Sequence, residues 1–271
     1  MPKVSVLLPT FNRPAWLLES IESVLSQDVA LELIVLDNGS DPETAQALST
    51  VTDPRVIKLR QEVNNAENPW RLMGKYSTGE YIVFFTDDDR MLPGGLAAKR
   101  AVLDEHHEAG MVFSPVRSIN TRGEDLGPSQ IGRLGHDCAL NEMIVACPVP
   151  MPAAMFRREY LGLISDDFNL FLDWALWLEI TSRSVCKYLD QDTVQLRLHA
   201  GSDTETHGVR GGAFAEWYPK VWKHWLARGV KPNRDGLSDM LILYLHFATT
   251  AGKGMEESIE SFQNEIERLV A

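Results

Sequence analysis

Three adjacent carboxylates, Asp87, Asp88 and Asp89, are the residues of this 271-residue chain that most clearly could do chemistry. They follow Gly79–Phe85, a short apolar run rich in β-branched and aromatic residues, which is typical of a strand buried on both faces. Like charges held this close repel one another, whereas a divalent cation such as Mg²⁺ or Mn²⁺ prefers hard carboxylate oxygens. The alternative is an acidic turn in which Asp89 caps the following helix.

Polar residues also follow two earlier strands that we expect in the chain. The apolar run Val4–Leu8 leads into the turn Thr10–Arg13, and the run Leu31–Leu36 leads into Asp37. Parallel strands place their carboxyl ends at one edge of a sheet, and open α/β proteins bind their ligands there. We therefore expect the three polar clusters to line one binding site rather than to be unrelated turns.

The elements that must position these clusters alternate between strands and helices over the first ninety residues. Strand–helix alternation implies right-handed crossovers and a mostly parallel sheet flanked by helices. The expected elements are Val4–Leu8, Ala15–Gln27, Leu31–Leu36, Pro42–Thr50, Val56–Leu59, Trp70–Ser77 and Gly79–Phe85.

The rest of the chain is less regular. Further helices and strands are expected at Leu96–His106, Met111–Ser114, Ala153–Arg157, Asp173–Ile180 and Val194–His199. Because Ser118–Gly135 is rich in Gly, Arg and Ser without periodicity, we expect a long loop there. Residues 1–213 are expected to form the sheet domain and residues 214–271 a helical C-terminal extension packed on it.

Aromatic residues recur at helical spacing in Trp217–Trp225, at the start of the expected extension. Such a stripe is typical of a helix face packed in a core. Because Lys220 and Lys223 lie between the aromatic residues, a peripheral contact with a membrane or a partner is the second interpretation. Two more amphipathic helices are expected at Leu237–Thr249 and Glu256–Val270.

Composition excludes several classes of protein. The formal net charge of -12 argues against a nucleic-acid binder, because a phosphate backbone would be repelled. We expect no transmembrane segment and no signal peptide, since no apolar stretch is long enough and a strand begins at Val4. The scattered cysteines Cys138, Cys147 and Cys186 do not indicate a disulfide framework or a zinc site. A cytoplasmic, reducing compartment is expected.

Three motifs of the chain resemble the leading motifs of the family 2 glycosyltransferases, in order and spacing as well as in residues. They are VSVLLPTFN at Val4–Asn12, ELIVLDNGS at Glu32–Ser40 and GEYIVFFTDDD at Gly79–Asp89. The SpsA-like inverting type is the form most similar to this pattern. The resemblance implies the GT-A fold of nucleotide-diphospho-sugar transferases. It also implies an inverting enzyme that moves a sugar from a nucleotide donor, such as a UDP- or dTDP-sugar, to an acceptor hydroxyl.

The resemblance further implies which residues bind the donor. Pro9, Thr10, Phe11 and Arg13 match the loop that contacts the base and ribose, and Asp37 matches the carboxylate that hydrogen-bonds the base. The helix whose polar residues approach the nucleotide carries Arg71 and Lys75 here, and Asp87 would face the ribose. The acceptor would be a glycan or a lipid-linked molecule in polysaccharide, cell-wall or glycoconjugate synthesis.

By the same resemblance, Asp88 would coordinate Mn²⁺ or Mg²⁺, and Asp89 would support the metal or the donor sugar. His199 would reach the metal or the pyrophosphate, and Arg197 would bind phosphate. Thr86 stands where many members of the family carry a further aspartate, so the metal would depend more on the diphosphate and less on protein carboxylates.

Asp173 matches the carboxylate that acts as catalytic base, although Leu172 replaces a common glutamate beside it. Partial burial next to Trp174 would raise the pKa of this carboxyl. The alternatives are that Asp173 caps its helix, or that Asp166 or Asp167 is the base.

Two other functions compete with the glycosyltransferase. A sugar-nucleotide pyrophosphorylase would carry a Gly-rich basic loop after its first strand, which this chain lacks. A catalytically silent relative that binds nucleotide sugars or acts as a scaffold is the main alternative, given the departures at Thr86 and Leu172.

Overall fold

The structure, a computed structural model, describes residues 4–164, 171–202, 206, 213–232, 236, 239, 240, 242 and 243. Its centre is a seven-stranded sheet in the order β10-β6-β9-β4-β1-β2-β3. The strands are β1 (Val4–Thr10), β2 (Leu31–Asn38), β3 (Val56–Gln61), β4 (Tyr81–Phe84), β6 (Ala109–Phe113), β9 (Ala154–Arg157) and β10 (Val185–Tyr188). β9 is antiparallel to both of its neighbours, and the other pairs are parallel. The expected mostly parallel sheet is confirmed.

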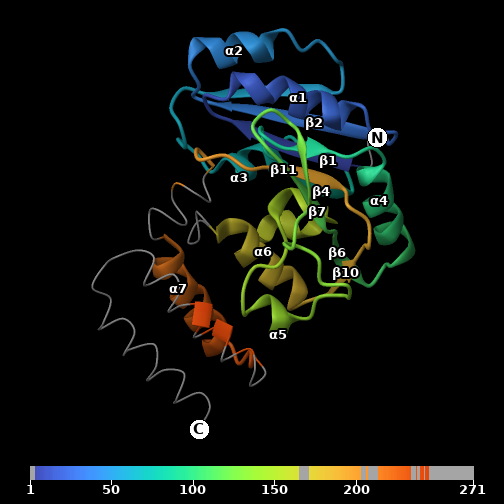
Figure 1. Ribbon diagram of the computed structural model, residues 1–271, viewed down its shortest axis with the longest axis vertical. Helices are drawn as coiled ribbons and strands as arrows, with labels where there is room; N and C mark the ends of the chain where they lie inside the picture. Colours follow the sequence, from blue (N-terminus) through green and yellow to red (C-terminus); the bar gives the residue numbers. More distant parts are fainter. Residues whose placement is uncertain are drawn as a thin grey trace.

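Helices cover both faces of this sheet (Figure 1). One face is covered by α1 (Pro14–Leu25), α2 (Pro42–Ser49) and α4 (Gly95–Glu105). The other is covered by α3 (Pro69–Gly74), α6 (Leu172–Thr181) and α7 (Ala213–Ala227). Within β1, Val6 and Leu8 pack in the core under α1, α2 and α4, and Leu7 packs in the core under α3, α6 and α7. Consecutive residues are therefore buried on opposite faces. Burial on both faces explains the continuous apolar run in the sequence.

Strand register brings the polar strand ends together. Thr10, the last residue of β1, lies opposite Asp37 of β2, and Leu7 lies opposite Phe84 at the end of β4. The residues that follow these strands therefore leave the sheet at one edge. The expected convergence of the three polar clusters is confirmed.

A second, four-stranded sheet lies beside the first, in the order β5-β11-β7-β8. It contains β5 (Arg90–Met91), β11 (Val194–Arg197), β7 (Val116–Ile119) and β8 (Asp125–Pro128). β5 begins directly after the three aspartates and pairs with β11, which returns the later chain to this edge. This pairing is what makes a late residue such as His199 available to the site.

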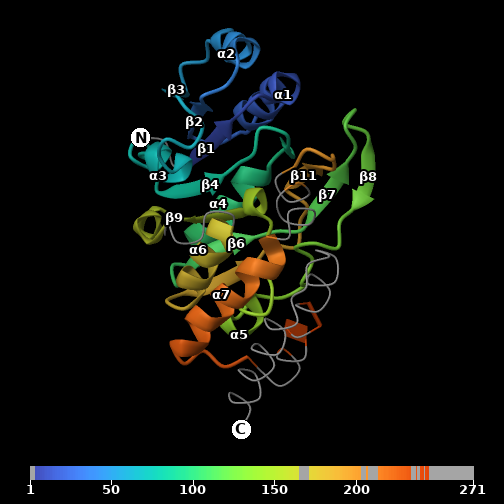
Figure 2. The same ribbon diagram turned by 90° about the vertical axis from the view of Figure 1, so that its left-hand side faces the viewer.

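The expectation of a long loop at Ser118–Gly135 is wrong in its first part, because β7 and β8 form a hairpin there. The hairpin projects from the body of the molecule (Figure 2). Its strands are short, and every residue of β8 is at least partly exposed. Hydrophobic periodicity needs a buried face, and this strand offers none to detect.

The aromatic stripe of α7 lies in the core, as expected. Trp222 is fully buried in one cluster with Trp174 and Trp177 of α6, and its Nε1 donates to the carbonyl of Ile144 at 2.8 Å. The helices expected at Leu237–Thr249 and Glu256–Val270 lie largely outside the described residues, so the 213/214 boundary remains a prediction. In the described part of the chain, no helix combines the length and apolar character required to cross a membrane.

The three cysteines, far apart in the sequence, contribute to the same core cluster between the sheet and α6. The amide of Cys138 donates to the carbonyl of Cys186 at 3.0 Å, and all three thiols are free. Burial raises the pKa of the Cys138 thiol to about 12 and also raises the pKa values of Cys147 and Cys186. These thiols are therefore protonated and weakly reactive at neutral pH.

Lys99 of α4 is fully buried, which is rare for lysine. Its Nζ donates to the carbonyls of Pro152 and Ala153 at 3.3 and 3.4 Å, in the 3₁₀ turn η1 (Met151–Ala153). Burial lowers the pKa of this amine from 10.5 to about 7. The difference corresponds to about 5 kcal/mol of disfavoured charging in the folded state.

We expect Lys99→Met to raise the free energy of unfolding at pH 6 by about 2 kcal/mol. The cost of charging the buried amine disappears, and this gain outweighs the loss of a hydrogen-bond donor to two carbonyls. Between pH 7 and pH 10.5 the unfolded lysine binds more protons than the folded one, so wild-type stability should gain a contribution as pH rises. Urea denaturation at pH 6 and pH 9 measures both effects. Lys58→Met, at an exposed position, is the control. A variant less stable than wild type at pH 6 would contradict the expectation.

Candidate active site

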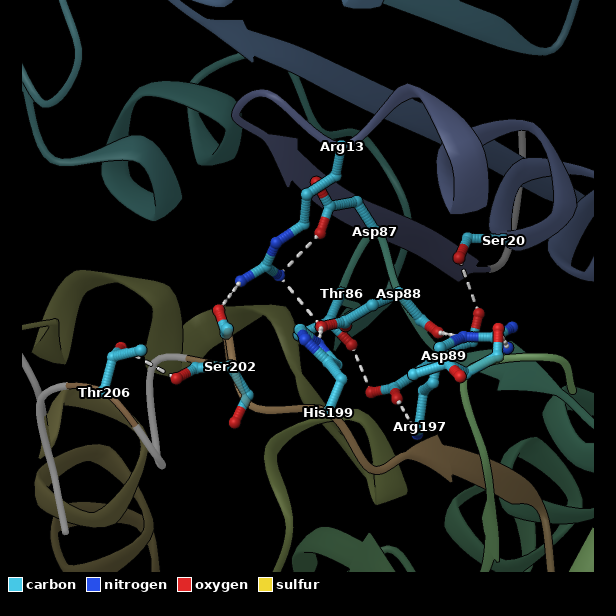
Figure 3. A network of polar contacts seen from close by, with 12 residues as sticks. Arg13, Ser20, Thr86, Asp87, Asp88, Asp89, Arg197, His199, Ser202 and Thr206 are labelled. Carbon is cyan, nitrogen blue, oxygen red and sulfur yellow. Dashed lines mark hydrogen bonds and ion pairs between the residues drawn. The ribbon is translucent and has the colours of Figure 1, made fainter. Parts of the chain in front are cut away.

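Arg13 joins two of the three aspartates at the edge of the sheet (Figure 3). Its Nη1 donates to Asp87 Oδ1 at 3.0 Å and to Asp88 Oδ2 at 2.9 Å. Arg13 immediately precedes Pro14, the first residue of α1, so the turn after β1 fixes where its side chain starts. Thr10 Oγ1 donates to Asp87 Oδ2 at 2.7 Å. Residues from the first and third motifs therefore form one hydrogen-bonded cluster.

His199 completes this cluster from the far end of the chain. Its Nε2 lies 2.8 Å from Asp88 Oδ2, and both side chains are less than a tenth exposed. The imidazole packs on the ring of Trp16 in α1, with 4.7 Å between ring centroids. Asp88 Oδ1 accepts no hydrogen bond from the described residues. Asp88 Oδ2 is thus shared by Arg13 and His199, whereas Asp88 Oδ1 has no hydrogen-bond donor among the described residues.

Burial disfavours the ionised form of Asp87. It raises the pKa of this carboxyl to about 6, an effect that the nearby Arg13 guanidinium opposes and the charge of Asp88 reinforces. Asp87 is 4% exposed. The Thr10 and Arg13 hydrogen bonds stabilise the carboxylate and hold its orientation.

Asp89 is turned into the protein. Its Oδ1 accepts from the backbone amide of Arg197 at 2.8 Å, and its Oδ2 contacts the hydroxyl of Thr86. Burial first, and the charge of Asp88 second, raise the pKa of Asp89 to about 8, so the carboxyl is largely protonated at pH 7. With both oxygens engaged, its expected part in metal binding fits poorly, and a positioning role fits better. Gly94 rather than Asp89 caps the next helix, so the capping alternative is wrong.

Arg197 does not present its guanidinium for phosphate, which corrects the role expected for it. The guanidinium is buried, with Nε donating to the carbonyl of Asp88 at 2.7 Å and Nη2 to Glu19 Oε2 at 2.5 Å. Nη1 donates to the carbonyls of Asn120 and Thr121 at 3.1 and 3.3 Å. A buried charge needs this full set of partners. Arg197 therefore fixes the backbone of Asp88.

Because lysine cannot span these partners, we expect Arg197→Lys to lower the free energy of unfolding by about 2–3 kcal/mol. We also expect the donor KM to rise about tenfold while kcat changes less, since Asp88 is displaced but retained. Denaturant unfolding and steady-state kinetics test both. Glu19→Gln, which weakens a single contact of Arg197, should have the smaller effect. Equal effects of the two substitutions would contradict a positioning role.

Asp37 lies at the end of β2 and is almost fully buried. Its Oδ1 accepts from the amide of Ser40 at 2.8 Å, and its Oδ2 forms an ion pair with Arg60. Arg60 was not predicted from the sequence; the signal for it is the parallel pairing of β2 and β3, which places Arg60 opposite Asp37. The ion pair holds the Asp37 carboxylate at the sheet edge.

The loop after β1 carries apolar residues at the same edge of the sheet. Pro9 lies within β1, and Phe11 is 41% exposed. Asn12 adopts a left-handed conformation, with φ of 54°, and its side-chain oxygen accepts from the amide of Asp41 at 2.8 Å. Asparagine tolerates this conformation better than most residues. The Asn12 contact ties the first and second polar clusters together.

Arg71 and Lys75, on α3, make their described contacts away from the aspartates. Nη2 of Arg71 donates to the carbonyl of Ile164 at 2.8 Å. Lys75 forms an ion pair with Glu67, and both of these side chains are exposed. The approach of α3 to the nucleotide stays a prediction.

Asp173 lies in the first turn of α6, and its Oδ1 accepts from the amide of Trp174 at 2.8 Å. Burial raises the pKa of this carboxyl to about 6. Its charge in turn helps raise the pKa values of Cys147 and Tyr218, and the Tyr218 ring lies 4.6 Å from that of Trp174. Phe171, not Asp173, occupies the N-cap position of α6, so the capping alternative is wrong, and the Asp173 carboxylate accepts only from the adjacent amide within the first turn. The raised pKa agrees with a base.

Asp173 Oδ2 accepts no hydrogen bond from the described residues, which leaves one oxygen of this carboxylate for a proton. α6 itself packs under β4, with 6.3 Å between the rings of Trp177 and Phe84. Asp166 and Asp167, the alternative bases, lie outside the described residues.

The carboxylate of Asp88 is a suitable ligand for Mn²⁺ or Mg²⁺, and His199 offers a nitrogen ligand beside it, which suits Mn²⁺ better than the oxygen-preferring Mg²⁺. Among the described residues, no three His, Cys, Asp or Glu side chains are arranged to hold a metal ion. The pair therefore fits a cation that takes its remaining ligands from a bound diphosphate or water.

Comparison with known proteins gives a consistent result. A family model described as Glycosyl transferase family 2 matches residues 5–163. An uncharacterized glycosyltransferase of Rickettsia felis is 26% identical over 208 residues, which cover 74% of this chain and 34% of that protein. A GalNAc(5)-diNAcBac-PP-undecaprenol beta-1,3-glucosyltransferase of Campylobacter jejuni is 37% identical over 102 residues, covering 36% of this chain and 33% of that protein. This chain thus spans about a third of the length of either relative.

A solved structure agrees in fold. The crystal structure of residues 1–349 of S. aureus TarS in complex with UDP-GlcNAc superposes with a TM-score of 0.68 at 20% identity, covering 99% of this chain and 82% of that chain. At this identity the likeness shows the fold alone. The expected GT-A architecture is confirmed.

Proposed function

This chain belongs to glycosyl transferase family 2, and on that basis we propose that it transfers a sugar from a nucleoside-diphosphate donor to an acceptor hydroxyl with inversion. The observation that carries the proposal is the hydrogen-bonded cluster of Thr10, Arg13, Asp87, Asp88 and His199 at the carboxyl edge of a parallel sheet. Ligands of open α/β proteins bind at this edge.

The donor in this proposal is a UDP- or dTDP-sugar. The TarS complex with UDP-GlcNAc supports a UDP donor, because its fold matches this chain. The buried carboxylate of Asp37 and the exposed ring of Phe11 offer hydrogen-bonding and stacking surface for a base. A glycan or lipid-linked acceptor is proposed, supported by the undecaprenol-linked acceptor in the name of the Campylobacter relative.

The leaving group requires stabilisation of negative charge. We assign Asp88 and His199 to hold Mn²⁺ or Mg²⁺, which when bound would act as a Lewis acid toward the departing nucleoside diphosphate. Arg197 and Asp89 keep the backbone of this segment in place. Thr10 and Arg13 hold the Asp87 carboxylate in place, and we assign Asp87 to face the ribose of the donor.

The acceptor hydroxyl needs a base on the sugar face opposite the leaving group. Asp173 is the proposed base. With a pKa of about 6 it is ionised at neutral pH, yet it holds a proton more readily than an exposed aspartate. Its Oδ1 stays bonded to the helix start, which orients Oδ2 for proton transfer.

A nucleotide-sugar-binding relative without activity is the second candidate, and the observation that favours it is Thr86, which supplies a hydroxyl where a carboxylate is common. The test incubates the full chain with Mn²⁺ and UDP-, dTDP- or GDP-sugars and measures release of free nucleoside diphosphate. Slow Mn²⁺-dependent hydrolysis is expected. If calorimetry shows donor binding but no nucleoside diphosphate is released with any acceptor of a broad panel, the protein binds nucleotide sugars without transferring them.

A further inference from the structure

The Arg13 guanidinium contacts three parts of the site at once. Besides bridging Asp87 and Asp88 through Nη1 (Figure 3), it donates from Nη2 to the carbonyl of Gly201 at 3.0 Å. Gly201 follows His199 by two residues, and His199 shares Asp88 Oδ2 with Arg13. One side chain therefore links the start of α1, the end of β4 and the segment that follows β11.

Arg13 and a divalent cation would make opposing demands on the same carboxylate. A cation bound by Asp88 and His199 would stand within a few ångströms of the guanidinium that now donates to Asp88 Oδ2. Like charges at such a separation repel strongly where side chains are buried and screening is weak. One of the two positive groups must withdraw.

Exposure indicates which group withdraws. The Arg13 side chain is 23% exposed, whereas those of Asp88 and His199 are 9% and 7% exposed. His199 is also packed on Trp16 and has a ring nitrogen that can bind a cation once it carries no proton. The flexible, partly solvated guanidinium can move into water at the lowest cost.

We propose that Arg13 and the divalent cation compete for Asp88, so that cation binding frees the guanidinium for the donor and releases the carbonyl of Gly201. The inference rests on the cation site of the proposed function. Arg13 is then the residue that links cation and donor binding, because the freed positive charge becomes available to the anionic diphosphate. Linkage requires the reciprocal effect: donor must raise cation affinity by the same factor.

The first test measures Mn²⁺ binding to the full chain by electron paramagnetic resonance, without nucleotide. Arg13→Gln is expected to bind Mn²⁺ about tenfold more tightly than wild type, because a competitor for Asp88 is gone. Arg13→Lys, which keeps the charge but not the fork, should fall between them. Arg60→Gln is the matched control. It also removes one guanidinium, the partner of Asp37 at the neighbouring strand end, and should leave Mn²⁺ affinity unchanged.

The second test follows hydrogen exchange in a peptide containing Gly201 and Ser202. Mn²⁺ should speed this exchange in wild type, because Arg13 releases Gly201, whereas Arg13→Gln should exchange fast with or without Mn²⁺. Addition of UDP should tighten Mn²⁺ binding less in Arg13→Gln than in wild type.

The outcomes separate the two hypotheses. Unchanged or weaker Mn²⁺ binding by Arg13→Gln overturns the competition, as does wild-type exchange at Gly201 that is insensitive to bound Mn²⁺. If Asp88→Asn binds Mn²⁺ as tightly as wild type, the cation site itself is misplaced, and the proposed function fails at that point instead.

Discussion

Asp88→Asn is expected to lower Mn²⁺-dependent turnover of a UDP-sugar by about 10³-fold and to remove the Mn²⁺ dependence of UDP binding. Asparagine keeps the shape of Asp88 but lacks the negative charge that a cation requires, and Asp88 has a carboxylate oxygen without a partner among the described residues. Calorimetry with UDP, with and without Mn²⁺, measures binding, and nucleotide release measures turnover. Mn²⁺-dependent affinity equal to that of wild type would remove Asp88 from the site.

Asp89→Asn is the matched control for this experiment. Because the pKa of Asp89 is raised to about 8, its carboxyl is largely neutral at pH 7, and an amide replaces it with little change in charge. The amide oxygen can still accept from the Arg197 backbone. We therefore expect a loss in turnover of about tenfold or less, with Mn²⁺ dependence intact. Identical losses in the two variants would mean that the cluster acts as a unit and that Asp88 has no separate role.

Asp173→Asn should retain donor binding and lose transfer by about 10³-fold, since removal of a general base typically costs 10²–10⁴-fold. Wild-type transfer should rise with pH through about 6 and then level off, because the carboxyl pKa is raised to about 6 and the ionised form is the base. The asparagine variant should lack this rising limb.

The fold of that variant is expected to be intact. The asparagine side-chain oxygen can accept the hydrogen bond from Trp174, and the cost of ionising a buried carboxyl above pH 6 disappears. Asp190→Asn, at an exposed aspartate, serves as the control. Near-normal transfer by Asp173→Asn, or a rising limb that persists in it, would contradict the assignment of Asp173 as the base and leave it only the hydrogen bond in the first turn of α6.

Local patterns predicted the parts of the fold that carry local signals. Each of the three apolar runs that end at Leu8, Leu36 and Phe85 is followed directly by polar residues. The parallel sheet and its polar edge follow from this pattern. The β7–β8 hairpin was missed because β8 has no buried residue and β7 is buried only at its two ends. Strand β9 was expected, yet its antiparallel place between β4 and β6 was not, since pairing partners are not written in a single strand.

The site shows the same division. Asp88 was placed correctly at the sheet edge because it follows a recognisable strand. The inward turn of Arg197 depends on the carbonyls of Asp88 and Asn120, which come from two other parts of the chain. The pairing of Arg60 with Asp37 likewise depends on strand register. Such contacts are set by tertiary structure, and no spacing in the sequence signals them.

The way Arg197 holds the hairpin has an evolutionary consequence. Its contacts at Asn120 and Thr121 are to backbone carbonyls, which every residue type possesses. Substitutions around this turn can therefore accumulate without breaking the hydrogen bonds that lead, through Arg197, to the backbone of Asp88. Exposed hairpin residues such as Leu126 contribute little to stability, so their substitution should change the free energy of unfolding only slightly. The hairpin is thus a segment in which substitutions can accumulate while the backbone of Asp88 stays in place.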